Sequence, residues 1–243
     1  MSRPVSIRLL VGTICTMLLS GVVAAQAKSI VDSLHNLSVS GPGTVKATAQ
    51  TEICIFCHIP HNARSDIAYL WNRQDPAGPY TPYHSSTLKA AVGQPTGTSR
   101  LCLSCHDGSI APGAVLSQPV PMAFAATLSG RASDLGTNLA DDHPISFDYV
   151  SAAMQSDSQL VSAVSLPPAI RLDINGQMQC TACHNPHNDQ FGKFLVMSNL
   201  GAGLCTSCHS KTNWSASSHA ASNKTCNISA PDPWPNSDYT TVR

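Results

Sequence analysis

The nine residues Cys54–Asn62, CIFCHIPHN, recur in closely similar form as CTACHNPHN at Cys180–Asn188. Both stretches begin with the frame C-x-x-C-H, which occurs twice more, as CLSCH at Cys102–His106 and as CTSCH at Cys205–His209. Every C-x-x-C pair is therefore followed directly by His. Because only 10 of the 243 residues are His, a fourfold coincidence of this kind is not expected by chance, and the four frames need a chemical explanation.

The C-x-x-C-H frame is the attachment site of c-type haem. Two thiols three residues apart, on one helical turn, each reach a vinyl group of one porphyrin, and the next residue, His, lies under the iron as proximal ligand. The chain is therefore predicted to bind four haem c groups covalently. The attaching cysteines would be Cys54, Cys57, Cys102, Cys105, Cys180, Cys183, Cys205 and Cys208, and the proximal ligands His58, His106, His184 and His209.

Two other interpretations of the cysteines stay open. The gap of 21 residues between Cys183 and Cys205 is close to that of a zinc ribbon. A secreted chain also permits a disulfide framework. Neither zinc nor disulfides require the adjacent His in all four frames, so haem is the favoured interpretation.

Three histidines outside the frames are predicted as second axial ligands. His61 and His187 each follow a proline, and His143 precedes one. Proline fixes its own φ and restricts the residue before it, so a ligand on such a segment loses less entropy on binding. The number of irons makes these three histidines better candidates than isolated surface histidines.

The fourth distal ligand is less constrained by the sequence. We favour His35, which precedes the first frame, over His84 and His219. A methionine is a further possibility, and a His/Met iron would have a raised potential. The four methionines beyond the N-terminal segment are more simply interpreted as core gap-fillers; they are Met122, Met154, Met178 and Met197.

The short spacing inside the repeated stretch limits which iron each histidine can bind. His58 and His61 are three residues apart, and three extended residues span at most about 10–11 Å. Two histidines on opposite faces of one iron need Cα atoms roughly 13 Å apart, taking an iron–nitrogen distance like that of zinc. His61 therefore serves a haem other than that of His58, and His187 a haem other than that of His184. This sharing predicts closely spaced haems.

The first 27 residues have the pattern of a secretory signal. Arg3 and Arg8 form a positive region, Leu9 to Ala25 is apolar, and Ala25-Gln26-Ala27 resembles a cleavage site. A membrane anchor is the alternative, but the apolar run is short for a span. Cleavage would remove Cys15 and leave Cys226 as the one cysteine outside the frames.

The repeated stretch suggests an internal duplication, because each copy is followed by a second C-x-x-C-H frame. We predict a signal peptide at 1–27, a first dihaem module at 28–118, a bridge with a distal His at 119–167, a second dihaem module at 168–212 and a C-terminal tail at 213–243. The tail is rich in Ser and Pro and is interpreted as a terminal arm.

Composition predicts a fold with little regular structure. Only 5% of the residues are aromatic, and 15 Gly and 17 Pro interrupt the chain, which favours turns over long helices. We expect a mostly irregular fold with a few short α-helices, wrapped around a stack of four haems that replace a side-chain core. Short helices are expected to begin at Thr51 and Ser99, and another to span Ser151–Val164.

The repeated C-x-x-C-H-x-P-H-N, together with Leu70-Trp71-Asn72 and Asp142-His143-Pro144-Ile145, resembles the doubled-C-x-x-C-H multihaem c-type cytochromes. Among these the chain is most similar to the tetrahaem cytochromes that polymerise into extracellular conducting filaments. The resemblance implies that all haems are bis-histidine, with distal ligands at His35, His61, His143 and His187. It also implies that His35 binds an iron of a neighbouring subunit. The Ser/Pro-rich tail departs from that family.

The favoured function is electron transfer rather than catalysis, because irons with two protein ligands offer no position to a substrate. The alternative is a multihaem reductase subunit with one open haem site. A leader sequence places the protein in the periplasm, at the cell surface or outside the cell, with redox proteins or an extracellular acceptor as partners and a homopolymer as a further possibility. Without Arg3 and Arg8 the chain has 12 basic and 14 acidic side chains, which argues against a nucleic-acid partner.

Overall fold

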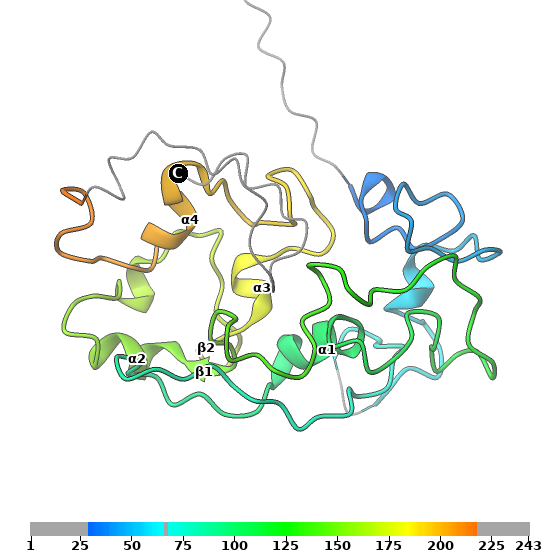
Figure 1. Cartoon of the computed structure of the whole chain (residues 1–243), viewed down its shortest axis with the longest axis horizontal. Coiled ribbons are helices and arrows are strands. Elements are labelled where there is room, and N and C mark those ends of the chain that lie inside the picture. The colour runs from blue at the N-terminus through cyan, green and yellow to red at the C-terminus, as the bar shows by residue number, and fades with distance from the viewer. Residues whose placement is uncertain (1–28, 66–67, 218–243) are drawn as a thin grey trace, which may run out of the picture.

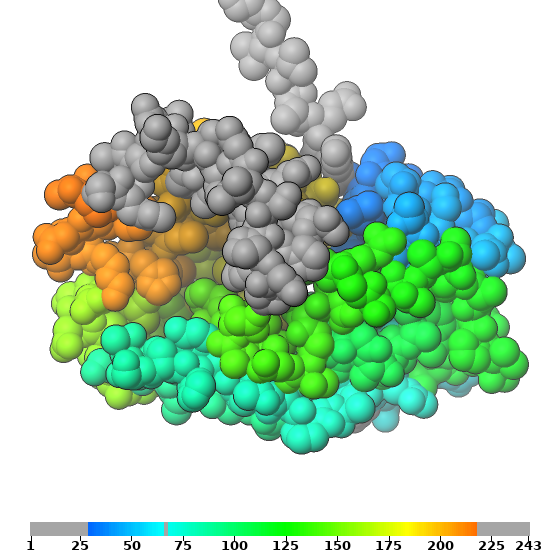
Figure 2. Space-filling view, viewed as in Figure 1, coloured from blue at the N-terminus to red at the C-terminus, as the bar shows by residue number. Residues whose placement is uncertain are grey.

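The computed structural model describes residues 29–65 and 68–217. The predicted signal peptide, His219 and Cys226 lie outside these residues, as does most of the predicted tail. Within the described part, none of the helices combines the length and the apolar character that crossing a membrane requires. Figures 1 and 2 show an elongated body, with the N-terminal described residues (blue) near one end and residues after about 205 (orange) near the other.

Most of the described chain consists of turns and extended segments, as predicted from its composition. Two very short strands, β1 (Phe147–Asp148) and β2 (Gln177–Met178), pair antiparallel, with Phe147 opposite Met178. The α-helices are α1 (Gly97–His106), α2 (Tyr149–Met154), α3 (Cys180–Cys183) and α4 (Gly203–Thr206). The 3-10 turns are η1 (Ile30–Asp32), η2 (Cys54–Phe56), η3 (Ala163–Ser165) and η4 (Leu200–Ala202).

Each of the four frames lies on a helical turn. The second frame forms the last turn of α1, the third forms α3, the fourth begins within α4, and the first begins with η2. A helical turn is the local geometry that brings two cysteines of C-x-x-C to one side of the chain. The frames are thus held in the conformation that the predicted covalent attachment requires.

The expected helix boundaries were partly wrong. Helix α1 begins at Gly97 rather than at Ser99, because Ser99 is fully buried and its hydroxyl bonds to the neighbouring helix instead of capping its own. The turn near Thr51 begins only at Cys54. The expected helix Ser151–Val164 ends early, at Met154.

Helices α1 and α3 pack against each other near the centre of the molecule (Figure 1). Thr98 Oγ1 and Thr181 Oγ1 lie 2.8 Å apart across this contact. The buried Ser99 hydroxyl donates to Gln179 Oε1 at 2.7 Å and accepts from the backbone N–H of Cys180 at 2.9 Å. Two frames that are 78 residues apart in the sequence are therefore joined by side-chain hydrogen bonds.

The proposed duplication extends beyond the nine repeated residues. His58 forms an isolated bridge with Trp71, and His184 forms the equivalent bridge with Leu195. In both copies the two residues before the bridge partner have positive φ, which is uncommon for residues other than glycine. These pairs are Tyr69-Leu70 and Lys193-Phe194.

Two backbone hydrogen bonds recur at equivalent positions of the two copies. They hold the returning loop against the haem frame. The bonds are Ile59 N to Leu70 O (2.9 Å) and Asn72 N to Cys57 O (2.9 Å) in the first copy, and Asn185 N to Phe194 O (2.7 Å) and Val196 N to Cys183 O (2.9 Å) in the second. The two copies therefore share one local fold over the frame and the loop that returns to it.

Two small apolar clusters supply the packed core of the described residues. The larger surrounds Tyr149 and Ala182 and joins α2, the β1–β2 pair and α3. The smaller contains Tyr80, Leu103 and Leu139 and lies against α1. Residues from the predicted bridge contribute to both clusters, so the bridge packs as part of the body.

Candidate functional site

The proximal histidines of the first three frames are oriented by backbone carbonyls. His58 Nδ1 lies 2.6 Å from Tyr69 O, His106 Nδ1 lies 2.8 Å from Ser133 O, and His184 Nδ1 lies 2.8 Å from Lys193 O. A carbonyl oxygen only accepts, so Nδ1 carries the proton and Nε2 keeps its lone pair. The hydrogen bond from Nδ1 to the carbonyl therefore fixes the tautomer that a histidine needs to ligate a metal through Nε2.

Three proximal histidines each face a histidine from outside the frames. The ring centroids of each pair lie 6.0 to 6.3 Å apart. The pairs are His58–His187 (6.1 Å, planes 23° apart), His35–His106 (6.0 Å, 58°) and His143–His209 (6.3 Å, 71°).

These separations fit an iron held between two imidazoles. With metal–nitrogen distances of roughly 2 Å on each side and about 1 Å from ring centroid to nitrogen, two axial histidines have centroids about 6 Å apart. Near-parallel rings in direct stacking contact would lie closer than His58 and His187 do; His35 and Phe194, for example, stack at 4.1 Å. The residues present therefore fit the axial ligand set of three haem irons.

The predicted ligand His61 lies exposed on the surface of the first copy. Its equivalent in the second copy is His187, which pairs with His58. His84 is exposed as well. Of the methionines considered as ligands, Met178 belongs to the apolar cluster around Tyr149 and Met197 packs against it. Met154 is exposed, and Met122 Sδ lies 3.6 Å from Gln50 Nε2.

His35 is the most enclosed of the predicted distal ligands. Its Nδ1 lies 3.3 Å from Pro186 O, and its ring stacks on Phe194. Burial, followed by the neighbouring His106, lowers the pKa of His35 to about 4. The ring is therefore neutral near pH 7, the form in which histidine binds a metal.

His143 and His209 form the pair at the end of the molecule near α4. His143 Nδ1 lies 2.9 Å from the carbonyl of Pro144, which fixes this ring in the same tautomer as the proximal histidines. Burial, then His143, lowers the pKa of His209. The Asp142-His143-Pro144 segment of the predicted bridge thus brings a histidine to the fourth frame.

The cysteines of successive frames are neighbours. Burial raises the pKa of Cys57 to about 12, and the Cys105 thiol adds to this rise. A hydrogen bond between Cys102 and Cys180 raises the pKa of the first and lowers that of the second to about 7. Frames one and two, and frames two and three, therefore lie against each other through their thiols.

Frames three and four are neighbours in the same way. Burial raises the pKa of Cys183 to about 11, and Cys208 is the next contribution to this rise. The four frames thus follow one another in space in their sequence order. Within the described residues, no group of three or more His, Cys, Asp or Glu side chains converges as a compact metal site; six of the histidines lie in three facing pairs instead.

Two residues beside the first frame were missed by the sequence analysis as parts of the site. Trp71 packs edge-on to His58 with ring centroids 5.8 Å apart, and its buried indole N–H has no acceptor among the described residues. Arg73 is buried with no exposed surface. The only sequence signal was for Trp71, which belongs to the segment Leu70-Trp71-Asn72 that carries the resemblance; Arg73 follows this segment directly.

Comparison with known families supports the haem interpretation. Residues 174–213, which hold the third and fourth frames, match the family model of the doubled CXXCH motif. This match supports a multihaem c-type cytochrome that acts in electron transfer, and its motifs imply covalently bound haem c. A search of curated proteins found no significant match.

Proposed function

We propose that the protein is a tetrahaem c-type cytochrome that carries electrons through four bis-histidine haems, numbered 1 to 4 in the order of the frames. The observation that carries the proposal is the set of three imidazole pairs at iron-bridging separation. In this assignment His187 closes haem 1, His35 closes haem 2 and His143 closes haem 4. Bound haem supplies a one-electron ferric/ferrous couple at each site.

The fourth pair follows from the duplication. His187 of the second copy faces His58 of the first, so equivalence of the two copies assigns His61 of the first copy to His184 of the second. The two repeated stretches then exchange their distal histidines, in agreement with the spacing limit that forbids each from closing its own haem. Removal of either stretch would leave one iron of the other copy with a single axial histidine.

The contacts among frames support a continuous electron path. The thiols of frames one and two, two and three, and three and four are neighbours, and α1 packs on α3. Haems attached at these positions would form a chain along the molecule, with the irregular polypeptide wrapped around it. With both axial positions filled by histidine, no iron offers a coordination site to a substrate, so the role is electron transfer and not catalysis.

We further propose that His35 acts in cis. Its ring lies 6.0 Å from His106 of the same chain and stacks on Phe194, so haem 2 is complete without a neighbouring subunit. This differs from the trans ligation that the resemblance implies, and it favours a carrier that works as a monomer over a filament built through His35. The predicted leader places this carrier outside the cytoplasm, where redox proteins or an extracellular acceptor would be its partners.

Spectroscopy of the purified holoprotein tests this function. The electron paramagnetic resonance (EPR) spectrum of the oxidised protein should integrate to four low-spin ferric haems per chain, and size-exclusion chromatography should give a monomer. A high-spin signal from one haem in four would favour the reductase with an open site. Chains assembled into long polymers would favour the filament.

A further inference from the structure

Arg73 is a permanently charged side chain in the interior of the molecule. Its exposed fraction is 0%. Its guanidinium donates to Ser104 Oγ at 3.1 Å, to Ser104 O at 2.8 Å, to Pro112 O at 2.8 Å and to Ala111 O at 3.2 Å. All four acceptors are neutral, so hydrogen bonds satisfy the guanidinium without cancelling its charge.

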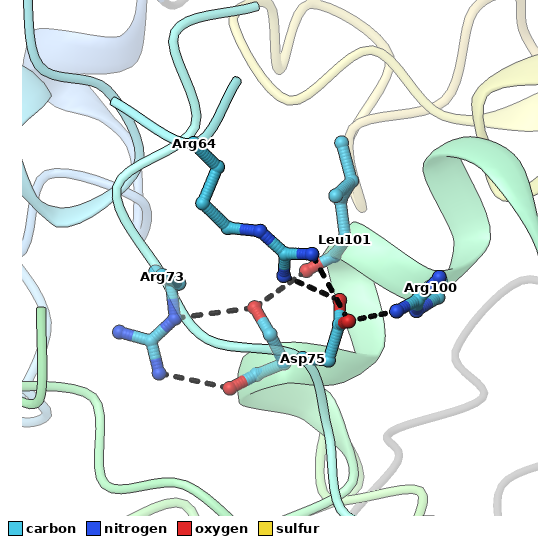
Figure 3. A network of polar contacts seen from close by, with 6 residues as sticks. Arg64, Arg73, Asp75, Arg100 and Leu101 are labelled. Carbon is cyan, nitrogen blue, oxygen red and sulfur yellow. Dashed lines mark hydrogen bonds and ion pairs between the residues drawn. The ribbon is translucent and has the colours of Figure 1, made fainter. Parts of the chain in front are cut away.

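The nearest carboxylate in the sequence does not neutralise Arg73. Asp75 binds Arg64 at 2.6 Å and also pairs with Arg100. Figure 3 shows both of these arginines pointing at the Asp75 carboxylate, whereas dashed lines join Arg73 to the backbone and side chain on α1. Across residues 29–65 and 68–217, no carboxylate lies within ion-pair distance of Arg73.

The charge of Arg73 lies between the first two haem frames. Ser104 is the residue before Cys105 in frame two. The adjacent Asn72 donates through Nδ2 to Ile55 O of frame one at 2.6 Å. Burial raises the pKa of both Cys57 and Cys105, and Arg73 is the nearby cation that opposes the rise.

The second copy has a neutral residue at the equivalent position. Met197 follows the bridge partner of His184 by two residues, as Arg73 follows that of His58. Ser207, which occupies in frame four the place of Ser104 in frame two, lies 3.6 Å from Met197 Sδ. The duplicated modules therefore share one local arrangement, with a guanidinium in the first and a thioether in the second.

We propose that Arg73 sets the order in which the haems are reduced, by raising the reduction potential of haem 1 above that of haem 3. The proposal rests on the proposed function. Reduction adds one electron from a redox partner to a ferric iron and lowers its charge by one, and a buried cation nearby favours the reduced state. Haems 1 and 3 have equivalent ligand sets in the proposed assignment, so the exchange of Arg73 for Met197 is a difference in charge at the same place of each module.

Two carboxylates near the frames also affect the reduction potentials of the haems. Asp107 also acts on Cys105 and accepts from Tyr80 Oη at 2.6 Å, so at haem 2 it offsets part of the Arg73 charge. Asp142 acts on Cys180 of frame three, where an anion disfavours reduction. The summed effect of these charges is therefore most favourable to reduction at haem 1, and an electron on the protein rests preferentially in the first module.

A redox titration followed by EPR tests the proposal, with Arg73→Met as the variant that copies the second module. A unit charge about 10 Å from a redox centre in a medium of effective dielectric about 20 changes its reduction equilibrium by roughly tenfold, which is about 59 mV for a one-electron couple. Arg73→Met should lower the midpoint of haem 1 by about this amount and shift that of haem 2, which Arg73 also adjoins, in the same direction. Arg73→Lys, which keeps the charge, should retain most of the wild-type midpoint.

If Arg73→Met does not fold, the reciprocal variant Met197→Arg tests the same proposal in the second module. Met197 is only partly buried, so Met197→Arg should be accommodated and should raise the midpoint of a haem in the second module. If either variant keeps four low-spin haems and all four midpoints stay unchanged, the role of Arg73 is overturned while the proposed function stands. Wild-type protein without haem would contradict the proposed function itself.

Discussion

The imidazole of His187 faces the imidazole of His58 at 6.1 Å, with ring planes 23° from parallel. One residue belongs to the second repeated stretch and the other to the first. Because both rings are held by short, proline-containing segments, the pair connects two modules that the sequence separates widely. In the proposed assignment, this pair means that neither module would complete its axial ligand sets alone.

Substitution of His187 tests the exchange of ligands between the two stretches. His187→Ala should leave haem 1 with one axial histidine, so one of the four haems should become high-spin while the other three remain low-spin. The EPR spectrum of the oxidised protein measures this change. His84→Ala removes an exposed histidine with no assigned iron and is the matched control.

Two outcomes would contradict the exchange of distal histidines between the two repeated stretches. If His187→Ala keeps all four haems low-spin, the His58–His187 pair does not hold an iron. If His84→Ala produces the high-spin haem, the distal ligand has been assigned to the wrong residue.

Substitution of His35 tests ligation within one chain. His35→Ala should produce one high-spin haem, because the ring 6.0 Å from His106 is lost. The variant and the wild type should both run as monomers on size-exclusion chromatography. A wild-type polymer that His35→Ala dissociates would instead show that His35 serves a neighbouring subunit.

The ring planes predict different EPR signals for different haems. Nearly parallel axial imidazoles donate to the same iron d orbital and give a rhombic low-spin signal, whereas nearly perpendicular ones leave two orbitals almost equal in energy and give a signal dominated by one large g value. Haem 1, with planes 23° apart, should give the rhombic type, and haem 4, with planes 71° apart, the large-g type. His187→Ala should remove a rhombic signal, and His143→Ala a large-g signal. The reverse correspondence would contradict the assigned pairs.

The contact between α1 and α3 predicts a stability effect at Ser99. Its hydroxyl is fully buried, donates to Gln179 and accepts from the Cys180 N–H. Ser99→Ala leaves the Cys180 N–H without its acceptor and removes one of two hydrogen bonds to Gln179 Oε1, which still accepts from Ser146. The loss should cost about 1–3 kcal/mol in the free energy of unfolding. Thermal unfolding of the holoprotein should show a midpoint lowered by several degrees.

The control for this effect is Ser85→Ala, which removes an exposed hydroxyl that contacts only the Thr87 hydroxyl. Its midpoint should match that of the wild type. If Ser99→Ala is as stable as Ser85→Ala, the hydrogen bonds across α1 and α3 do not hold the modules together.

The sequence predicted the sparse secondary structure, which the structure confirms, and it singled out the histidines that lie in the three facing pairs. Local chemistry explains both results: Gly and Pro limit helix length, and the C-x-x-C-H spacing marks the histidines to consider. The spacing also predicts that His61 and His58 do not share an iron. The frame that each of the other histidines faces could not be predicted, because residues such as His143 and His209 meet only through long-range packing.

The burial of Arg73 shows why parts of the site could not be predicted from the sequence. A charged residue in a loop is ordinarily exposed, and nothing in its neighbours signals that carbonyls of Ala111 and Pro112 close over it. Its equivalence to Met197 depends on the bridges of His58 and His184. The error at Ser99 has a similar origin: a good N-cap residue was used as a buried link between two helices.

Intact-mass measurement of the purified holoprotein tests the account most directly. Each chain should carry the processed polypeptide plus four haem groups, and the mass should survive denaturation because every haem is bonded through two thioethers. A mass equal to that of the bare polypeptide, or to that of the polypeptide with metal ions alone, would contradict the claim that these four frames hold haem.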